Sequence, residues 1–324
     1  MTKLRQMAVW GPALVFLAAM LWSSDAPFRL HLAQSLSSNF IVLGEHFFDC
    51  LVAVPVLFFC WEDIKKLSWR EWLAVLFVAI GGSALGSVFF TQAFHYVNPS
   101  VAILLQKVQP LIAIFLAWAI LGEQLRPRFW VWCIVALFGA YLVSFPNFVP
   151  QTYAGEAFNP NVQGALLAFL AATLWGASTV FGKYVLRKAA FQTMTGLRFV
   201  IAFVFLIFLN TCQHTLSAMN TLTATDYLFI LIIALTSGVF SLYLYYYGLQ
   251  FTRASIATIA ELGFPLAAVF VNAYFIPGNW ALGTLLGLYP GQWAGTAILL
   301  FAILKLSKVN VGEVSLKSET VFTV

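Results

Sequence analysis

Long apolar stretches alternate with short polar loops along almost the whole chain. They occupy residues 8–30, 40–61, 71–96, 99–121, 129–146, 163–185, 193–212, 227–250, 254–276 and 283–304. Most exceed the ~18 residues that a membrane-spanning helix needs, and none alternates like a transmembrane β-strand. The pattern predicts an all-α integral membrane protein with ten transmembrane helices.

The composition supports a membrane protein. Of the 324 residues, 61% are hydrophobic and 9% charged, and the mean hydropathy is +0.89. Soluble domains carry roughly 25% charged residues, so a soluble globular protein is excluded. The basic residues are scattered between apolar stretches instead of gathering on one face, so membrane lipid is the expected partner and nucleic acid is excluded.

The two halves of the chain repeat each other. A shift of 153 residues aligns eight identical positions of the first and sixth stretches, from Gly11 on Gly164 to Phe28 on Phe181. Shifts of 152 and 155 align the second stretch with the seventh and the fourth with the ninth. The first stretch follows basic residues like a secretory signal, but its internal copy predicts that it is a structural helix and is retained.

Five helices in each half imply that the second half enters the membrane from the opposite side. This predicts an inverted repeat, an architecture typical of secondary transporters. The expected organisation is a first repeat at 1–146, an extracytoplasmic linker at 147–162, a second repeat at 163–306 and a disordered cytoplasmic tail at 307–324.

The distribution of positive charge predicts the orientation. With a cytoplasmic N-terminus, fourteen of the 17 Lys and Arg residues fall on the inner side and only Arg29 on the outer side, while Lys107 and Arg198 fall within helices. The positive-inside rule therefore predicts that both termini are cytoplasmic, with the protein in the cell inner (plasma) membrane.

Short motifs at corresponding places of the two halves carry a family resemblance. They are the openings at 18–22 (AAMLW) and 171–176 (AATLWG), the segment 195–199 (TGLRF), and the helix from Gln109-Pro110 into Leu121-Gly122-Glu123. Over residues 8–306 the chain resembles the EamA family of the drug/metabolite transporter superfamily. The resemblance implies ten helices in two inverted five-helix repeats, and a protein that commonly exports small metabolites, amino acids or drugs.

The halves differ in two of these motifs. His46 stands in the second stretch where the seventh has Arg198, and residues 276–278 (IPG) end the ninth stretch where residues 121–123 (LGE) end the fourth. The repeat is therefore expected to be approximate.

Four charged residues inside predicted helices are the strongest functional candidates: Glu45, Asp49, Lys107 and Glu261. A charge at the centre of a membrane helix costs on the order of 3 kcal/mol, so each needs a partner, a water-filled cavity or a substrate.

Glu261 and Gln106 are symmetry mates under the shift of 155, and each lies four residues before a proline. We expect them to face each other across a central cavity, with Lys107 beside them and with their carbonyls released by the prolines to bind substrate or an ion. In the alternative, the prolines only kink the helices and Lys107 neutralises a carboxylate for packing.

Glu45, His46 and Asp49 lie together in the second stretch, with the two carboxylates one helical turn apart. Carboxylates and histidine at membrane depth are typical of proton relays, so these residues are candidates for proton coupling. The alternative is a structural ion pair with Lys107. The four histidines lie on different segments, so neither a metal site nor a catalytic site is predicted.

Aromatic residues are candidates for the apolar part of a binding site. Trp22 and Trp175 are equivalent in the two halves, and Tyr243 and Tyr247 share a helical face. They predict an aromatic box, with Gln92 as a further polar group, although an interfacial belt or simple packing explains them equally well. Arg198 is expected to be mainly structural, with its side chain snorkelling to the cytoplasmic face, and a gate or carboxylate-binding role is the alternative.

No nucleotide-binding signature and no cofactor motif is present, which favours a secondary active transporter. Lys107 and Glu261 together favour a zwitterionic, amino-acid-like or amphipathic metabolite, moved by alternating access in an exporter or exchanger. A carrier of organic cations or quaternary amines is the nearest alternative. A membrane-embedded enzyme using Glu45, His46 and Asp49, and a passive channel, are the others.

Overall fold

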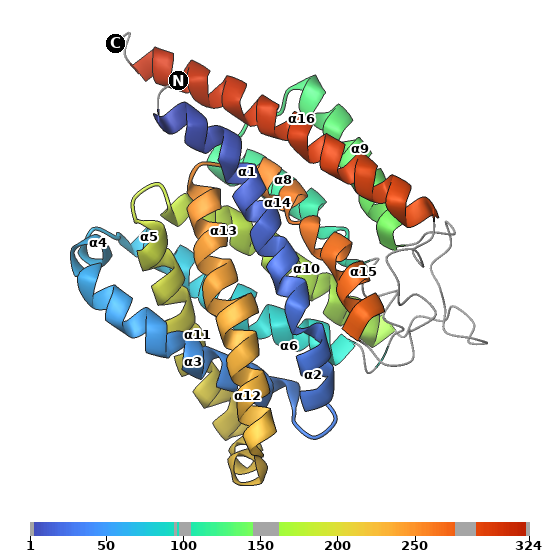
Figure 1. Ribbon diagram of the computed structural model, residues 1–324. Coiled ribbons are helices and arrows are strands. Elements are labelled where there is room, and N and C mark those ends of the chain that lie inside the picture. The colour runs from blue at the N-terminus through green and yellow to red at the C-terminus, as the bar shows by residue number, and fades with distance from the viewer. Residues whose placement is uncertain (1–2, 94–95, 97–104, 145–161, 276–289, 322–324) are drawn as a thin grey trace.

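A computed structural model describes residues 3–93, 96, 105–144, 162–275 and 290–321 (Figure 1). Every regular element within these residues is helical. The N-terminal half contains α1 (Lys3–Trp22), the 3₁₀ turn η1 (Ser23–Asp25), α2 (Ala26–Leu32), α3 (Ser38–Phe59), α4 (Trp61–Lys65), α5 (Trp69–Leu76), the π-helical η2 (Phe77–Leu85), α6 (Gly86–Ala93), α8 (Gln109–Leu121) and α9 (Pro127–Ser144). The C-terminal half contains α10 (Val162–Val185), α11 (Phe191–Cys212), the 3₁₀ segment η3 (Thr215–Thr221), α12 (Ala224–Ile233), the π-helical η4 (Ala234–Phe240), α13 (Ser241–Gln250), α14 (Ala254–Ala260), α15 (Gly263–Phe275) and α16 (Pro290–Val321).

The described helices have the length and the surface of a membrane protein. Seven spans are long and apolar enough to cross a bilayer, and three further apolar helices are shorter. Large apolar side chains such as Phe58 and Phe59, the latter 92% exposed, lie on the outside. Such a surface is suited to lipid and not to water. The all-α membrane fold is thus confirmed, whereas ten crossings stay a prediction.

Two pairs of apolar stretches are interrupted at corresponding places in the two halves. The π-helical segments η2 and η4 occur in the third and eighth stretches, and their last residues, Leu85 and Phe240, are 155 positions apart. The fourth stretch is broken by a turn at 107–108 and the ninth by a turn at 261–262. Helix interruptions at membrane depth are typical of transporter binding sites.

The turn at 261–262 corrects one expectation. The carbonyl oxygen of Glu261 is not free, because it accepts a hydrogen bond from the N–H of Phe264 at 3.0 Å. The chain closes a tight turn before Pro265, and this turn satisfies the carbonyl that a proline in a continuous helix would leave unpaired.

Helices of one half pack mainly on helices of the other. The N-terminal α1 packs on α13, α3 on α11, and α9 on α16, while α10 packs on η2, α6 and α8 (Figure 1). The beginning of α1 and the end of α16 lie at the same end of the bundle (Figure 1). Near this end, the Ser307 hydroxyl donates to the Val9 carbonyl at 2.7 Å.

A loop contact fixes α8 against α14. Gly122 ends α8 in the left-handed conformation, with φ of 66°, and this conformation directs Glu123 toward the start of α14. The Glu123 carboxylate accepts hydrogen bonds from the N–H groups of Ala254 (2.8 Å) and Ser255 (3.1 Å), and so caps the N-terminus of α14. This cap sets the relative position of the two helices that lead into Gln109 and Glu261.

Asp63 makes a similar cap outside the membrane-spanning segments. Its carboxylate accepts from the N–H of Ala190, just before α11, at 3.1 Å, and forms an ion pair with Lys66 at 2.8 Å. The hydrogen bond from Lys66, with smaller help from Ala190, holds the pKa of Asp63 below its usual value.

The C-terminal tail differs from the sequence expectation. Helix α16 continues to Val321, so residues 307–321 are helical and the prediction of disorder there is wrong. No proline follows Pro290 in this segment, and Lys, Leu, Glu and Val allow the helix to propagate.

The close packing of α9 on α16 generates the first prediction. A Cβ atom on Gly295 would lie 2.7 Å from the carbonyl oxygen of Gly139, and overpacking of this kind costs roughly 1–3 kcal/mol. We expect Gly295→Val to lower the melting temperature of the detergent-solubilised protein by several degrees. Leu300→Val, at a lipid-exposed position of the same helix, is the control and should leave the melting temperature unchanged. Equal melting temperatures for the two variants would contradict this packing.

Candidate functional site

Glu261 is the carboxylate around which the interior polar groups gather. It lies in the turn between α14 and α15 and is 8% exposed. Its Oε1 accepts hydrogen bonds from the hydroxyls of Tyr245 (2.7 Å) and Thr179 (2.9 Å), and its Oε2 accepts one from the side-chain amide of Gln109 (2.8 Å). These four residues, from α8, α10, α13 and the 261–262 turn, form what we call the Glu261 cluster.

The donors in the Glu261 cluster are all electrically neutral. A hydrogen bond to an ionised group contributes about 1.5–3 kcal/mol, roughly twice as much as a neutral one. Three such bonds replace the water that an ionised Glu261 would otherwise need. Among the described residues no Lys or Arg forms an ion pair with Glu261. The arrangement suits a ligand that brings hydrogen-bond donors or a positive charge.

An aromatic wall borders the cluster. The ring of Trp22, at the end of α1, lies 5.3 Å from the ring of Tyr245 at an angle of 47°. Tyr245 also meets Tyr246 edge-on at 5.2 Å. An aromatic ligand placed next to Glu261 would therefore find ring surfaces from both halves of the chain.

Arg198 turns inward from α11. Its guanidinium donates to the hydroxyls of Ser83 in η2 and of Tyr246 (3.0 Å), and lies 5.8 Å from the centre of the Tyr246 ring. It is also close enough to interact electrostatically with Glu261 and Asp49. The expectation that Arg198 snorkels to the cytoplasmic face is therefore wrong, because its partners lie inside the bundle.

Glu45 belongs to an ion-pair network at the start of the chain. Arg29 of α2 contacts the Glu45 carboxylate at 2.8 Å and the Asp25 carboxylate at 2.8 Å. The alternative of an ion pair with Lys107 is not seen among the described residues, in which Glu45 pairs with Arg29.

His46 and Asp49 lie further along α3. The Nδ1 of His46 is 2.9 Å from the Val42 carbonyl oxygen, and its ring packs edge-on near Phe199. Asp49 is 2% exposed and lies against Gly238 of η4. Within the described residues, neither His46 Nε2 nor Asp49 Oδ1 has a hydrogen-bond partner.

Three predicted residues make no described contact with Glu261. No hydrogen bond or ion pair joins the side chains of Gln92, Gln106 and Lys107 to the described residues. Gln109 takes the place expected for Gln106. Trp175 donates from Nε1 to the Gly82 carbonyl at 3.0 Å and packs on Phe90.

The two predicted tyrosines share a face, but this face turns toward α11. Tyr243 and Tyr247 both contact the ring of Phe191, with centroid distances of 6.4 and 5.0 Å. Tyr245 and Tyr246 instead contact Glu261 and Arg198.

The cluster residues that the sequence analysis did not single out are Gln109, Thr179 and Tyr245. Gln109 had a usable signal, since it lies one helical turn after Gln106 on the same face and next to Pro110. Tyr245 lies in the recognised tyrosine run. Thr179 had no signal, because a single threonine in an apolar helix is common.

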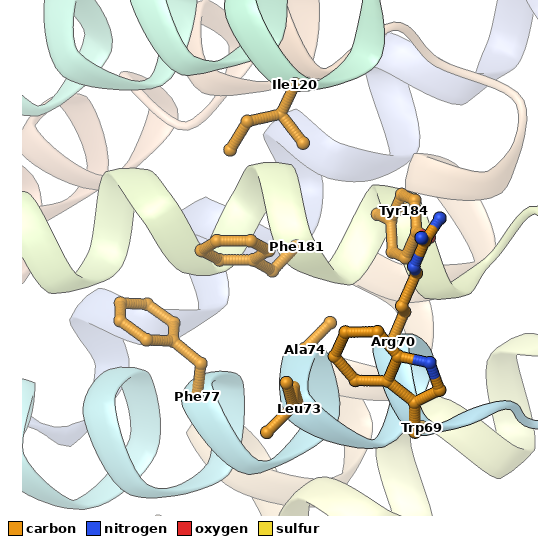
Figure 2. Close-up of a pocket in the computed structure, with 8 residues that line it drawn as sticks. All are labelled: Trp69, Arg70, Leu73, Ala74, Phe77, Ile120, Phe181 and Tyr184. Atoms are coloured by element: carbon orange, nitrogen blue, oxygen red, sulfur yellow. The ribbon is translucent and has the colours of Figure 1, made fainter.

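A separate cavity of about 460 Å³ opens between α5, η2, α8 and α10. Figure 2 shows its lining, in which Phe77, Phe181 and Ile120 surround the apolar part while Arg70 and Trp69 lie at one end. This cavity is lined by none of the predicted site residues and by no member of the Glu261 cluster. It is therefore distinct from the polar site around Glu261.

Comparison with known proteins shows the family and the relatives of this chain. The EamA-like transporter family matches residues 9–145 and again residues 162–308. The chain is 34% identical over 305 residues to "Riboflavin transporter ImpX" of Fusobacterium nucleatum, covering 93% of this chain and 98% of that protein. It is 26% identical to "Uncharacterized transporter YwfM" of Bacillus subtilis, over 76% of each chain.

A solved structure described as "Crystal structure of protein" has the same fold. It matches with a TM-score of 0.71 at 15% sequence identity and covers 93% of this chain and 97% of that one. The family match over both halves confirms the family that the motifs predicted. The chain therefore belongs to the EamA-like transporter family and is a multi-pass membrane transporter, not an enzyme.

Proposed function

We propose that this protein is a secondary carrier for a flavin, with riboflavin as substrate. The observation that carries this proposal is the 34% identity to a riboflavin transporter over nearly the full length of both chains. Riboflavin is a planar tricyclic ring with an uncharged polyol side chain. Its ring matches the aromatic wall of Trp22 and Tyr245, and its hydroxyl and N–H donors match the Glu261 carboxylate.

The same proposal includes the architecture expected from the repeats: ten transmembrane helices as two inverted five-helix halves. The paired interruptions at 107–108 and 261–262, and the paired π-helical segments, support it. So does the packing, since α1 on α13 is the counterpart of α10 on η2 and α6. We place the protein in the inner membrane of a bacterium, with both termini cytoplasmic.

The substrate site lies at the seam between the halves. Gln109 and Trp22 come from the first half, whereas Thr179, Tyr245 and Glu261 come from the second. Movement of one half against the other breaks the Gln109–Glu261 hydrogen bond and the Trp22–Tyr245 contact together. A substrate that stacks on the rings and donates to Glu261 replaces both contacts, which is how binding favours the alternating-access movement.

An organic cation is the second candidate substrate. A carboxylate that pairs with no cation among the described residues and lies beside two aromatic rings is a suitable site for a quaternary amine. The amino-acid-like substrate expected from Lys107 and Glu261 has less support, since Lys107 forms no described contact with that carboxylate. Export or exchange remains our proposed direction, and a proton gradient the proposed source of energy.

Binding of riboflavin to the purified protein is the direct test of the substrate. We expect the intrinsic fluorescence of riboflavin to be quenched by the protein, because its ring stacks on Trp22 and Tyr245. We also expect proteoliposomes preloaded with riboflavin to show counterflow, as a carrier does and a channel does not. Binding of quaternary amines or of amino acids, with no binding of riboflavin, would assign the site to those classes and overturn the flavin proposal.

A pair of tyrosine variants tests the Glu261 cluster. Tyr245→Phe removes the hydroxyl that donates to Glu261 and keeps the ring, so about 1.5–3 kcal/mol of interaction is lost. We expect at least a tenfold fall in the rate of counterflow. Tyr243→Phe is the matched control, since the Tyr243 hydroxyl has no hydrogen-bond partner among the described residues, and counterflow should be preserved. The reverse result would move the site to the Tyr243 and Tyr247 face.

Replacement of the aromatic wall tests the orientation of the substrate. Trp22→Ala removes a stacking surface worth about 0.5–1.5 kcal/mol, so we expect the Kd for riboflavin to rise roughly three- to tenfold. Trp118→Ala, on the exposed face of α8, is the control and should bind with the wild-type Kd. An unchanged Kd for Trp22→Ala would place the flavin ring elsewhere.

A further inference from the structure

Asp49 is an interior carboxylate with no ion-pair partner among the described residues. Glu45 has Arg29, and Glu261 has three hydrogen-bond donors. Asp49 is 2% exposed and receives a hydrogen bond from the backbone of Val239 in η4, while its Oδ1 has no hydrogen-bond partner within the described residues. The backbone of η4 closes over it, because a Cβ atom on Gly238 would collide with the Asp49 carboxylate.

The charged neighbours of Asp49 are few. Glu45 and His46 lie one turn earlier on α3, and Arg198 of α11 interacts electrostatically with Asp49. The other titratable neighbours are Cys50 on α3 and Tyr243 on α13, and both are uncharged near neutral pH. The elements η4 and α6, which also pack on α3, carry no ionisable side chain.

The single positive charge of Arg198 cannot neutralise both Asp49 and Glu261. It interacts electrostatically with both Asp49 and Glu261, while its hydrogen bonds go to Ser83 and Tyr246. One guanidinium therefore serves two buried carboxylates. The three donors of the Glu261 cluster favour an ionised Glu261, so the uncompensated negative charge falls on Asp49. A buried carboxylate in that situation binds a proton, because burying the ion with one neutral backbone donor and no ion-pair partner is far more expensive.

A metal ion is a poorer candidate for this place. Sodium or a divalent ion needs several oxygen ligands, and no group of three His, Cys, Asp or Glu within the described residues could hold one. A proton needs only one carboxylate oxygen without a partner.

We propose that Asp49 binds the coupling proton of this carrier. The inference rests on the proposed transport function and adds a second site to it. Asp49 lies at the seam, on α3 of the first half against η4 and α11 of the second. When the halves separate, water reaches Asp49 and accepts its proton, and the resulting carboxylate pairs with Arg198. When the halves close, the carboxylate loses its water and takes up a proton from the side to which the carrier last opened.

Infrared spectroscopy of the purified protein tests this site without any substrate. A protonated carboxyl group shows a C=O stretching band that a carboxylate lacks. We expect the wild type at neutral pH to show such a band, Asp49→Asn to lose it, and Glu45→Gln to retain it, because the Glu45 carboxylate is paired with Arg29. Persistence of the whole band in Asp49→Asn, or its loss in Glu45→Gln, would overturn the proposal.

Proteoliposomes with an imposed pH gradient test the coupling. With one proton moved per riboflavin, we expect the wild type to build about a tenfold concentration ratio per pH unit. Asp49→Asn, which resembles the protonated state, should retain counterflow and reach a ratio of one. Wild-type counterflow without accumulation, or accumulation by Asp49→Asn, would contradict proton coupling at Asp49. Absence of riboflavin counterflow in the wild type would contradict the proposed substrate, and the infrared result would still decide whether Asp49 holds a proton.

Discussion

A carboxylate inside an apolar bundle has to be solvated by the protein itself, and this constraint organises the centre of the molecule. Glu261 meets it with three neutral donors that come from α8, α10 and α13. Four helical segments are thereby fixed around one side chain. The cap of α14 by Glu123 and the turn at 261–262 both serve to bring that side chain to the place where the donors converge.

Three contacts around the site cross the seam between the two halves of the chain. Gln109 reaches Glu261, Trp22 reaches Tyr245, and Arg198 reaches Ser83, in each case from one half of the chain to the other. Hydrogen bonds and ring contacts of this kind can be exchanged for equivalent contacts with a ligand, whereas tightly packed glycine contacts such as Gly139 with Gly295, which also join the two halves, cannot. The first set therefore suits the part of the seam that opens, and the second suits a part that stays closed.

The sequence predicted an all-α membrane protein correctly, because the thickness of the bilayer fixes the length of the apolar stretches. It also predicted Glu261, since an intramembrane charge is expensive enough to need a reason. The donors around Glu261 were harder to predict. The repeat predicted that Gln106 would face Glu261. Because the helix is broken at 107–108, the side chain of Gln109 contacts the Glu261 carboxylate instead. The π-helical turn of η4 changes the rotation of α13, so Tyr245 and Tyr246 face the interior charges while Tyr243 and Tyr247 face Phe191. Local breaks of this kind depend on tertiary packing and leave little trace in a pattern of apolar residues.

An experimental structure with bound riboflavin would show whether the Glu261 cluster is the substrate site. We predict that the flavin ring lies against Trp22 and Tyr245, and that Glu261 accepts a hydrogen bond from the substrate in place of the one from Gln109. A flavin bound in the cavity between α5, η2, α8 and α10 (Figure 2), with the Glu261 hydrogen bonds intact, would contradict the account.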